Sequence, residues 1–140
     1  MFMKKNLSVA AIIALLLSVG SAHAAIPSEN ACPDLAGTYK TPDGATFKMT
    51  SNLEQDGAVV FGYDGDTWVA DGQPRDSHTG ALNPQSCPSI ITCQNKILTR
   101  SYTCYGRKSV EIYSLDQNSN IDVSGHGMGL NGNLVYTRVN

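Results

Sequence analysis

The side chains of this chain that could take part in acid–base catalysis are few and scattered. His78 lies in a polar stretch with Arg75 and Asp76 near it, whereas His126 lies among glycines close to the C-terminus. A nucleophilic or acid–base mechanism needs a base that a partner orients at hydrogen-bond distance. No spacing of acidic residues provides such a pair, so the sequence predicts a protein that is not an enzyme. Because loops carry function disproportionately, Arg75 and His78 remain candidate binding residues, while we expect His126 to be solvated.

Two motifs match cofactor or metal sites by spelling alone. Residues 127–132 read G-x-G-x-x-G, but the dinucleotide motif needs a helix after it, and the eight residues that follow are typical of a strand. Asp64-Gly65-Asp66 lacks the downstream glutamate of a calcium-binding EF-hand loop and is typical of a turn. The sequence therefore predicts no cofactor and no metal ion.

The four cysteines are Cys32, Cys87, Cys93 and Cys104. Their spacing does not match a zinc site, and an even number in a small exported domain predicts two disulfides. Of the three possible connectivities, a two-residue turn at 95–96 would place Cys87 directly opposite Cys104. Cys93 would then be left for Cys32, so the register predicts the pairs Cys87–Cys104 and Cys32–Cys93.

The N-terminal residues have the layout of a secretory signal peptide. Two lysines, Lys4 and Lys5, precede an apolar run over 7–20, and Ala22-His23-Ala24 is a typical cleavage site. The run is shorter than the roughly 20 residues that span a bilayer, which makes a membrane anchor the weaker interpretation. We expect a leader over 1–24, cleavage after Ala24, and a single secreted or periplasmic domain over 25–140.

Charge argues against two classes of partner. The chain has 10 basic and 12 acidic residues, and two of the lysines belong to the predicted leader. The remaining domain is therefore acidic and contains no basic cluster. The sequence predicts neither nucleic-acid binding nor stable membrane insertion, and it indicates no oligomeric state.

After the leader, short runs rich in Thr, Val, Ile, Tyr and Phe alternate with turn residues, which is typical of an all-β domain. The predicted strands cover 35–41, 45–52, 57–63, a short run that contains Trp68, 89–94, 97–105, 109–115, 120–124 and 134–139. The stretch 72–86 is polar and patternless and is predicted to be a loop. We expect a small antiparallel up-and-down β-barrel of about eight to nine strands, with a β-sandwich as the alternative.

The last two predicted strands suggest a particular hairpin. A type I′ turn at Asn131–Gly132 would place Leu134, Tyr136 and Arg138 opposite three glycines on one face. Glycine is unfavourable inside a strand, so making room for large neighbours would explain its presence there.

The two ends of the domain together resemble one family. Gly37-Thr38-Tyr39 resembles the Gly-x-Trp opening of calycin-type barrels such as lipocalins and avidins, with Tyr39 in place of the tryptophan. Arg138 resembles the arginine that packs over that tryptophan in lipocalins. The resemblance implies that Arg138 closes the barrel against Tyr39 through a cation–π contact, and that the barrel binds a small hydrophobic molecule.

Two functions from different classes follow. In the first, aromatic side chains inside the barrel, Phe47, Phe61, Trp68 and Tyr136, line a site for a small hydrophobic molecule, although Trp68 could equally be a core residue. In the second, the chain is an exported interaction module, such as an inhibitor or a surface-associated protein, that uses the loop over 72–86. A barrel of about eight strands can either be filled by side chains or hold one small ligand, and a filled interior favours the second function.

Overall fold

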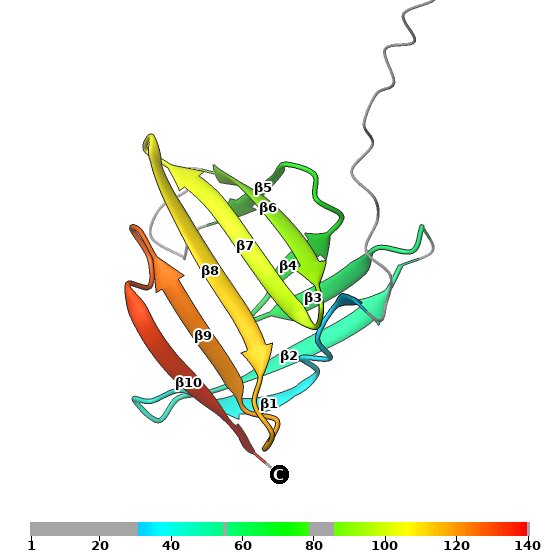
Figure 1. Cartoon of the computed structure of the whole chain (residues 1–140), viewed down its shortest axis with the longest axis vertical. Helices are drawn as coiled ribbons and strands as arrows, with labels where there is room; N and C mark the ends of the chain where they lie inside the picture. Colours follow the sequence, from blue (N-terminus) through cyan, green and yellow to red (C-terminus); the bar gives the residue numbers. More distant parts are fainter. Residues whose placement is uncertain (1–30, 55, 79–85, 140) are drawn as a thin grey trace, which may run out of the picture.

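The computed structural model describes residues 31–54, 56–78 and 86–139, which form ten antiparallel strands and no α-helix (Figure 1). The strands are β1 (Gly37–Lys40), β2 (Thr46–Leu53), β3 (Val59–Tyr63), β4 (Asp66–Ala70), β5 (Arg75–His78), β6 (Ser86–Gln94), β7 (Ile97–Cys104), β8 (Arg107–Leu115), β9 (Ile121–His126) and β10 (Gly132–Val139). The predicted leader lies outside the described residues. Within them, no helix is long and apolar enough to cross a membrane.

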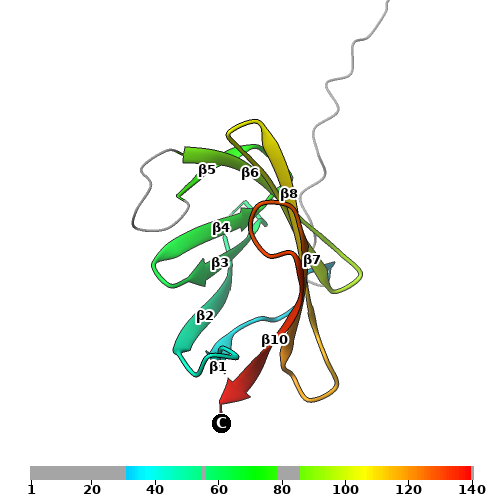
Figure 2. The ribbon, with the colours of Figure 1, turned by 90° about the vertical axis from the view of Figure 1, so that its left-hand side faces the viewer.

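The strands form one sheet that curls into a nearly closed barrel, as the sequence predicts. Each strand pairs with the next along the chain except β4 with β5, and β1 pairs with β10. Strands β4 and β5 are therefore the two ends of the sheet. A hydrogen bond from the Gly72 amide to the Ile91 carbonyl, 3.0 Å long, joins the segment after β4 to β6. Figure 2 shows β2, β3 and β4 on one side of the barrel and β10 on the other.

Strand β5 corrects the prediction of a loop over 72–86. Arg75 pairs with Ser89 and His78 with Ser86, so β6 also begins earlier than expected and the sheet has ten strands. The four residues of β5 are polar and lack apolar alternation, so their sequence contains no strand signal. Pairing with β6 makes this segment a strand. Residues 79–85, also part of the predicted loop, lie outside the described residues.

The core follows from the two-residue alternation of the strands. In β7, Leu98, Arg100, Tyr102 and Cys104 lie on the buried side, and the intervening residues face outward. Most inward side chains of the strands form one large apolar cluster, and Cys87, Tyr102 and Cys104 form a second, smaller one. The largest fully buried residues all belong to the first cluster and are Tyr39, Phe61, Leu35, Met49, Leu98 and Ile121. The interior of the barrel is thus filled largely by its own side chains.

Both predicted disulfides are confirmed, Cys32–Cys93 and Cys87–Cys104, with Cα separations of 4.8 and 5.0 Å. The predicted turn is confirmed as well, because Asn95 and Lys96 have φ angles of 52° and 62°, as a type I′ turn requires. The two bonds lie at opposite ends of β6. The Cys32–Cys93 bond closes the longer loop, with a sequence separation of 61, and in the chain-entropy model it stabilises the fold by about 4 kcal/mol. Two such bonds indicate an oxidising environment.

The predicted register of the last hairpin is wrong. Leu134 pairs with Val123 and Tyr136 with Ile121, and the strands are joined by residues 127–131 rather than by a tight turn. The shift is an even number of residues, so Leu134 and Tyr136 still face inward. The loop over 127–131 packs onto the end of the barrel. No local sequence pattern indicates this contact.

The contact between Arg138 and Tyr39 is present. The two residues are cross-strand partners, and the guanidinium carbon lies 5.8 Å from the centre of the ring. Arg138 Nη2 also donates a hydrogen bond of 3.0 Å to the Ala36 carbonyl. A Cβ atom at Gly37 would lie 3.1 Å from the same nitrogen, and Gly37 has a φ of +156°, so glycine admits the arginine here. Arg138 therefore ties the entry of β1 to the end of β10.

Replacing Arg138 by alanine is expected to lower the free energy of unfolding by about 1–3 kcal/mol, mainly through lost packing over the Tyr39 ring. Urea denaturation with the disulfides intact measures the change. Arg107→Ala, which removes an exposed arginine at the start of β8, is the matched control. Equal stability of Arg138→Ala and the parent would contradict this role.

Candidate functional site

A buried ion pair lies inside the barrel. Arg100 on β7 and Glu111 on β8 are cross-strand partners, and Arg100 Nη1 lies 3.2 Å from Glu111 Oε2. Each side chain is only 11% exposed. Burying two charges is costly unless their remaining polar atoms find partners, so the neighbours of this pair decide whether it is tolerated.

Three aromatic residues surround the pair. Tyr102 donates a hydrogen bond of 3.0 Å to Glu111 Oε1, and Tyr113 donates one of 2.7 Å to Oε2. The Arg100 guanidinium lies between two rings, 4.9 Å from the centre of Trp68 and 4.7 Å from that of Tyr102. Arg100 Nε is buried and has no hydrogen-bond partner. The carboxylate is thus satisfied by hydrogen bonds and the cation largely by aromatic faces.

The tyrosine hydroxyls of this network stay protonated. Burial raises the pKa of Tyr113 far above its ordinary value, and the charge of Glu111 raises it further. The same two causes raise the pKa of Tyr102. Both hydroxyls therefore remain hydrogen-bond donors to the carboxylate at neutral pH.

A chain of aromatic contacts leads from this network toward the surface. Trp68 stacks on Tyr63 at 5.3 Å, Tyr63 meets Phe47 edge-on at 5.0 Å, and Phe47 meets Tyr136 edge-on at 4.8 Å. Trp68 is buried, but Phe47, Tyr63 and Tyr136 are partly exposed. We call these three residues the mouth cluster. They lie toward the end of the barrel that carries the β1–β2, β3–β4 and β9–β10 turns, which faces the viewer in Figure 2.

The hydroxyl groups of the mouth cluster are coupled to each other. The hydroxyl groups of Tyr63 and Tyr136 interact, because each contributes to the pKa of the other. Burial raises the pKa of Tyr136 to about 12, with further contributions from Tyr63 and from the charge of Glu111. Burial also raises the pKa of Tyr63. The cluster therefore presents ring faces together with protonated hydroxyls.

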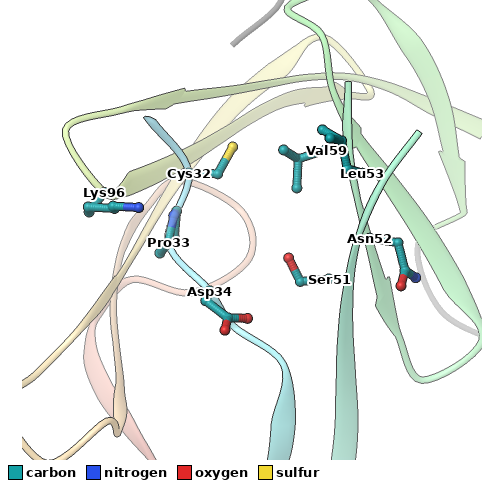
Figure 3. Close-up of a pocket in the computed structure, with 8 residues that line it drawn as sticks. All are labelled: Cys32, Pro33, Asp34, Ser51, Asn52, Leu53, Val59 and Lys96. Carbon is teal, nitrogen blue, oxygen red and sulfur yellow. The ribbon is translucent and has the colours of Figure 1, made fainter. Parts of the chain in front are cut away.

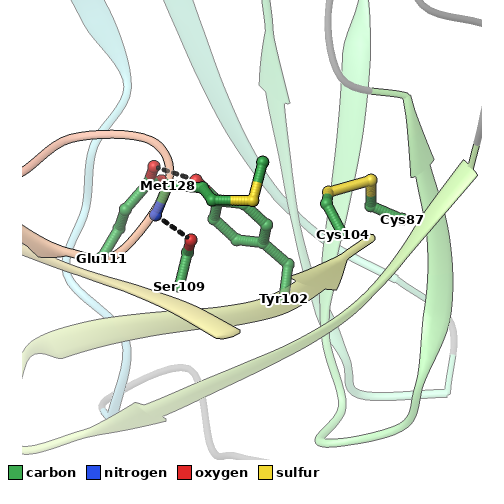
Figure 4. The surroundings of a disulfide bond; sticks show 6 residues. All are labelled: Cys87, Tyr102, Cys104, Ser109, Glu111 and Met128. Carbon is green, nitrogen blue, oxygen red and sulfur yellow. Dashed lines mark hydrogen bonds between the residues drawn. A yellow bond between two sulfur atoms is a disulfide. The ribbon is translucent and has the colours of Figure 1, made fainter. Parts of the chain in front are cut away.

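The loop over 127–131, here called the inward loop, packs onto the ion-pair network (Figure 4). The Met128 amide donates a hydrogen bond of 2.7 Å to Ser109 Oγ. A Cβ atom at Gly129 would lie 2.1 Å from the Tyr102 hydroxyl oxygen. The glycine thus lets the backbone approach Tyr102 and cover this end of the barrel.

The candidate residues from the sequence separate into two groups. Phe47 and Tyr136 lie together in the mouth cluster, whereas Phe61 and Trp68 are core residues with 0% and 5% exposure. Trp68 still touches the cluster through Tyr63.

The two polar candidates lie on β5. Arg75 is half exposed and forms an ion pair with Asp71, which anchors the segment between β4 and β5. His78 pairs with Ser86 through the backbone, and its side chain is outside the described residues. His126 is exposed, as predicted.

Sequence reasoning missed Arg100, Glu111 and Tyr63. A signal was available, because strand alternation places Arg100 on the inward face with Leu98 and Glu111 on that face with Tyr113. A charge at an inward position of each of two adjacent strands predicts a buried pair.

A hollow of about 240 Å³ lies beside the Cys32–Cys93 disulfide and is a second candidate site (Figure 3). Asp34 and Lys96 contribute opposite charges to it, and Asn52 contributes an amide. The two charges are of opposite sign and offset each other, and none of the described residues that line this hollow is aromatic. We therefore regard the mouth cluster as the candidate site.

The tyrosines of the site predict a loss of stability at alkaline pH. Below pH 10 both the folded and the unfolded protein keep the Tyr136 proton, so its contribution is complete. Between pH 10 and about 12 the unfolded chain loses the proton first, and stability falls as pH rises. Urea denaturation between pH 8 and 11.5 should give a shallower decline for Tyr136→Phe than for the parent. Tyr105→Phe, at a residue that is 60% exposed, is the control; equal slopes for the parent and Tyr136→Phe would contradict the prediction.

The inward loop predicts a second effect. Gly129→Ala is expected to destabilise the protein by about 1–3 kcal/mol, because the added methyl group overlaps the Tyr102 hydroxyl. Met128→Ala, at an adjacent residue that is 44% exposed, should change stability much less. Thermal unfolding measures both, and a Gly129→Ala variant as stable as Met128→Ala would show that the loop does not pack tightly.

Comparison with known proteins adds no functional information. No family model matches the sequence, and no curated protein matches it. In the described part of the chain, no group of three or more His, Cys, Asp or Glu side chains is placed to hold a metal ion. The function must therefore be argued from the geometry of the barrel.

Proposed function

We propose that this protein is an exported, non-enzymatic binding protein that holds a small hydrophobic molecule at the mouth cluster. The two disulfides support work in an oxidising compartment. Secretion through the leader over 1–24 remains a prediction from the sequence, because those residues lie outside the described part.

The observation that carries the proposal is the partial exposure of three aromatic rings from three strands, of which Phe47 contacts both tyrosines. Phe47 comes from β2, Tyr63 from β3 and Tyr136 from β10. Aromatic rings with one face in a core and another in solvent offer both apolar area and hydroxyl groups to a ligand. Strand pairing holds all three in place, so a ligand meets a prepared surface.

The filled interior argues against a ligand inside the barrel and, by the criterion drawn from the sequence, favours the interaction module. The partly exposed rings of the mouth cluster are what still supports small-molecule binding, at the surface of the barrel. Phe61, Met49 and Leu98 are fully buried beneath the cluster, in the space that an internal ligand would occupy. We therefore place the ligand on the mouth cluster rather than deep inside the barrel. Aromatic stacking on Tyr63 and Tyr136 then provides most of the contact.

The buried carboxylates support a non-enzymatic role. Glu111 accepts hydrogen bonds from Arg100, Tyr102 and Tyr113. Asp71 is bound by Arg75. A general base must be able to accept the proton of a substrate, and these carboxylates are instead engaged in holding the fold.

Binding can be measured through Trp68, the single tryptophan of the chain, which stacks on Tyr63. The neutral dye N-phenyl-1-naphthylamine is expected to quench Trp68 fluorescence and to raise the melting temperature. Tyr136→Ala should weaken binding by about 2- to 10-fold, the loss expected for one aromatic contact.

Val135→Ala is the matched control, since Val135 precedes Tyr136 on β10 but is exposed on the outer face. An equal loss in both variants would show that binding does not use the mouth cluster. No response to this dye or to a broad set of lipophilic metabolites would contradict the proposal. The interaction module that uses 72–86 would then be the better account.

A further inference from the structure

We infer that the mouth cluster selects a small organic cation, such as a quaternary or protonated amine, over a neutral molecule of the same shape. This inference rests on the proposed function and specifies the chemical class of its ligand.

Two carboxylates flank Tyr63 at the tip of the β3–β4 hairpin. Asp66 is the cross-strand partner of Tyr63, and Asp64 follows it in the turn with a φ of 45°. Asp64 is exposed and Asp66 partly so. Neither forms an ion pair with any described residue. Their charges are therefore available to a ligand that stands on the Tyr63 ring.

The cations near the cluster do not cancel this charge. Arg100 is paired with Glu111 and lies over two rings, and its effect on the pKa of Tyr63 is smaller than that of Glu111, so it does not reverse the sign of the field. Lys40 and Lys48 lie on β1 and β2, but they occupy exposed positions that alternate with the inward Tyr39 and Phe47. Arg138 is held over the Tyr39 ring and on the Ala36 carbonyl. At the Tyr63 side of the cluster, Asp64 and Asp66 are not paired with any described cation.

The tyrosines of the cluster report the same sign of field. The charge of Glu111 helps to raise the pKa of both Tyr63 and Tyr136, and Asp64 adds to this effect on Tyr63. Arg100 opposes it at Tyr63, as a smaller contribution than either carboxylate. A negative field that disfavours ionised tyrosine favours a bound cation.

The ring faces themselves favour a cation. The negative face of an aromatic ring attracts an ammonium or guanidinium group, and the attraction grows as water is removed. This barrel already uses that interaction, because Trp68 and Tyr102 enclose Arg100. The mouth cluster continues the same aromatic chain through Tyr63 to Phe47, with its rings partly open to solvent.

The test compares two probes of nearly identical shape, phenyltrimethylammonium and tert-butylbenzene, on the full domain with its disulfides intact. Trp68 fluorescence reads binding of each probe. The cation is expected to bind about 5- to 30-fold more tightly than the neutral probe. This preference should shrink in 0.5 M NaCl, because salt screens exposed carboxylates.

The charge-neutral variant Asp64→Asn/Asp66→Asn should reduce the preference to about twofold or less and leave tert-butylbenzene binding unchanged. Glu54→Gln/Asp122→Asn removes the same charge from exposed positions away from the β3–β4 tip and should keep the preference.

Equal affinity of the parent for the two probes would overturn the inference while the proposed function stands. An unchanged preference in Asp64→Asn/Asp66→Asn would overturn it as well. Binding of neither probe would contradict the proposed function and this inference together.

Discussion

An ion pair inside a barrel this small needs neighbours that satisfy its remaining polar atoms, and the Arg100–Glu111 pair imposes this requirement on the surrounding strands. Removing either charge alone would leave the other buried without its counter-charge, which typically destabilises a fold by about 3–5 kcal/mol. Tyr102 and Tyr113 satisfy the carboxylate, and Trp68 covers the guanidinium. The positions of these aromatic residues are therefore determined by the pair as much as by apolar burial.

Trp68 connects the buried ion pair to the candidate site. Trp68 faces Arg100 on one side and stacks on Tyr63 on the other, so the buried network and the mouth cluster share one residue. The inward loop closes over Tyr102 at the same end of the barrel. The mouth residue Tyr63 packs against a ring, Trp68, that the ion pair itself contacts.

The barrel is held together by different contacts at two places, between β1 and β10 and between the sheet ends β4 and β5. Between β1 and β10, backbone pairing and the Arg138–Tyr39 contact join the two ends of the domain. Between β4 and β5 there is no strand pairing among the described residues, and a single backbone hydrogen bond from Gly72 reaches β6. The Asp71–Arg75 ion pair holds the connection between β4 and β5. Sheet ends are the weak points of an open barrel, and here they are short strands, β4 and β5.

Local chemistry in the sequence was sufficient to predict much of this protein. Alternating apolar residues and turn residues determined the all-β barrel, and the turn at 95–96 determined both disulfides, because a two-residue turn leaves a single register. The Arg138–Tyr39 contact is implied by a resemblance, and the sequence predicts Phe47 and Tyr136 as site residues, which contact each other in the structure.

Tertiary structure decided the rest. The sequence of β5 has no apolar alternation, and only pairing with β6 makes it a strand. In place of the predicted tight turn, the last hairpin has a longer loop, in which Met128 packs on Ser109 and Gly129 packs on Tyr102. The contact of Tyr136 with Phe47 joins β10 to β2 and depends on closure of the barrel between β1 and β10. Arg100 and Glu111 meet through the register of the adjacent strands β7 and β8. Periodicity shows which way each side chain points, but neighbours across a sheet are set by register and closure, which are properties of the whole fold.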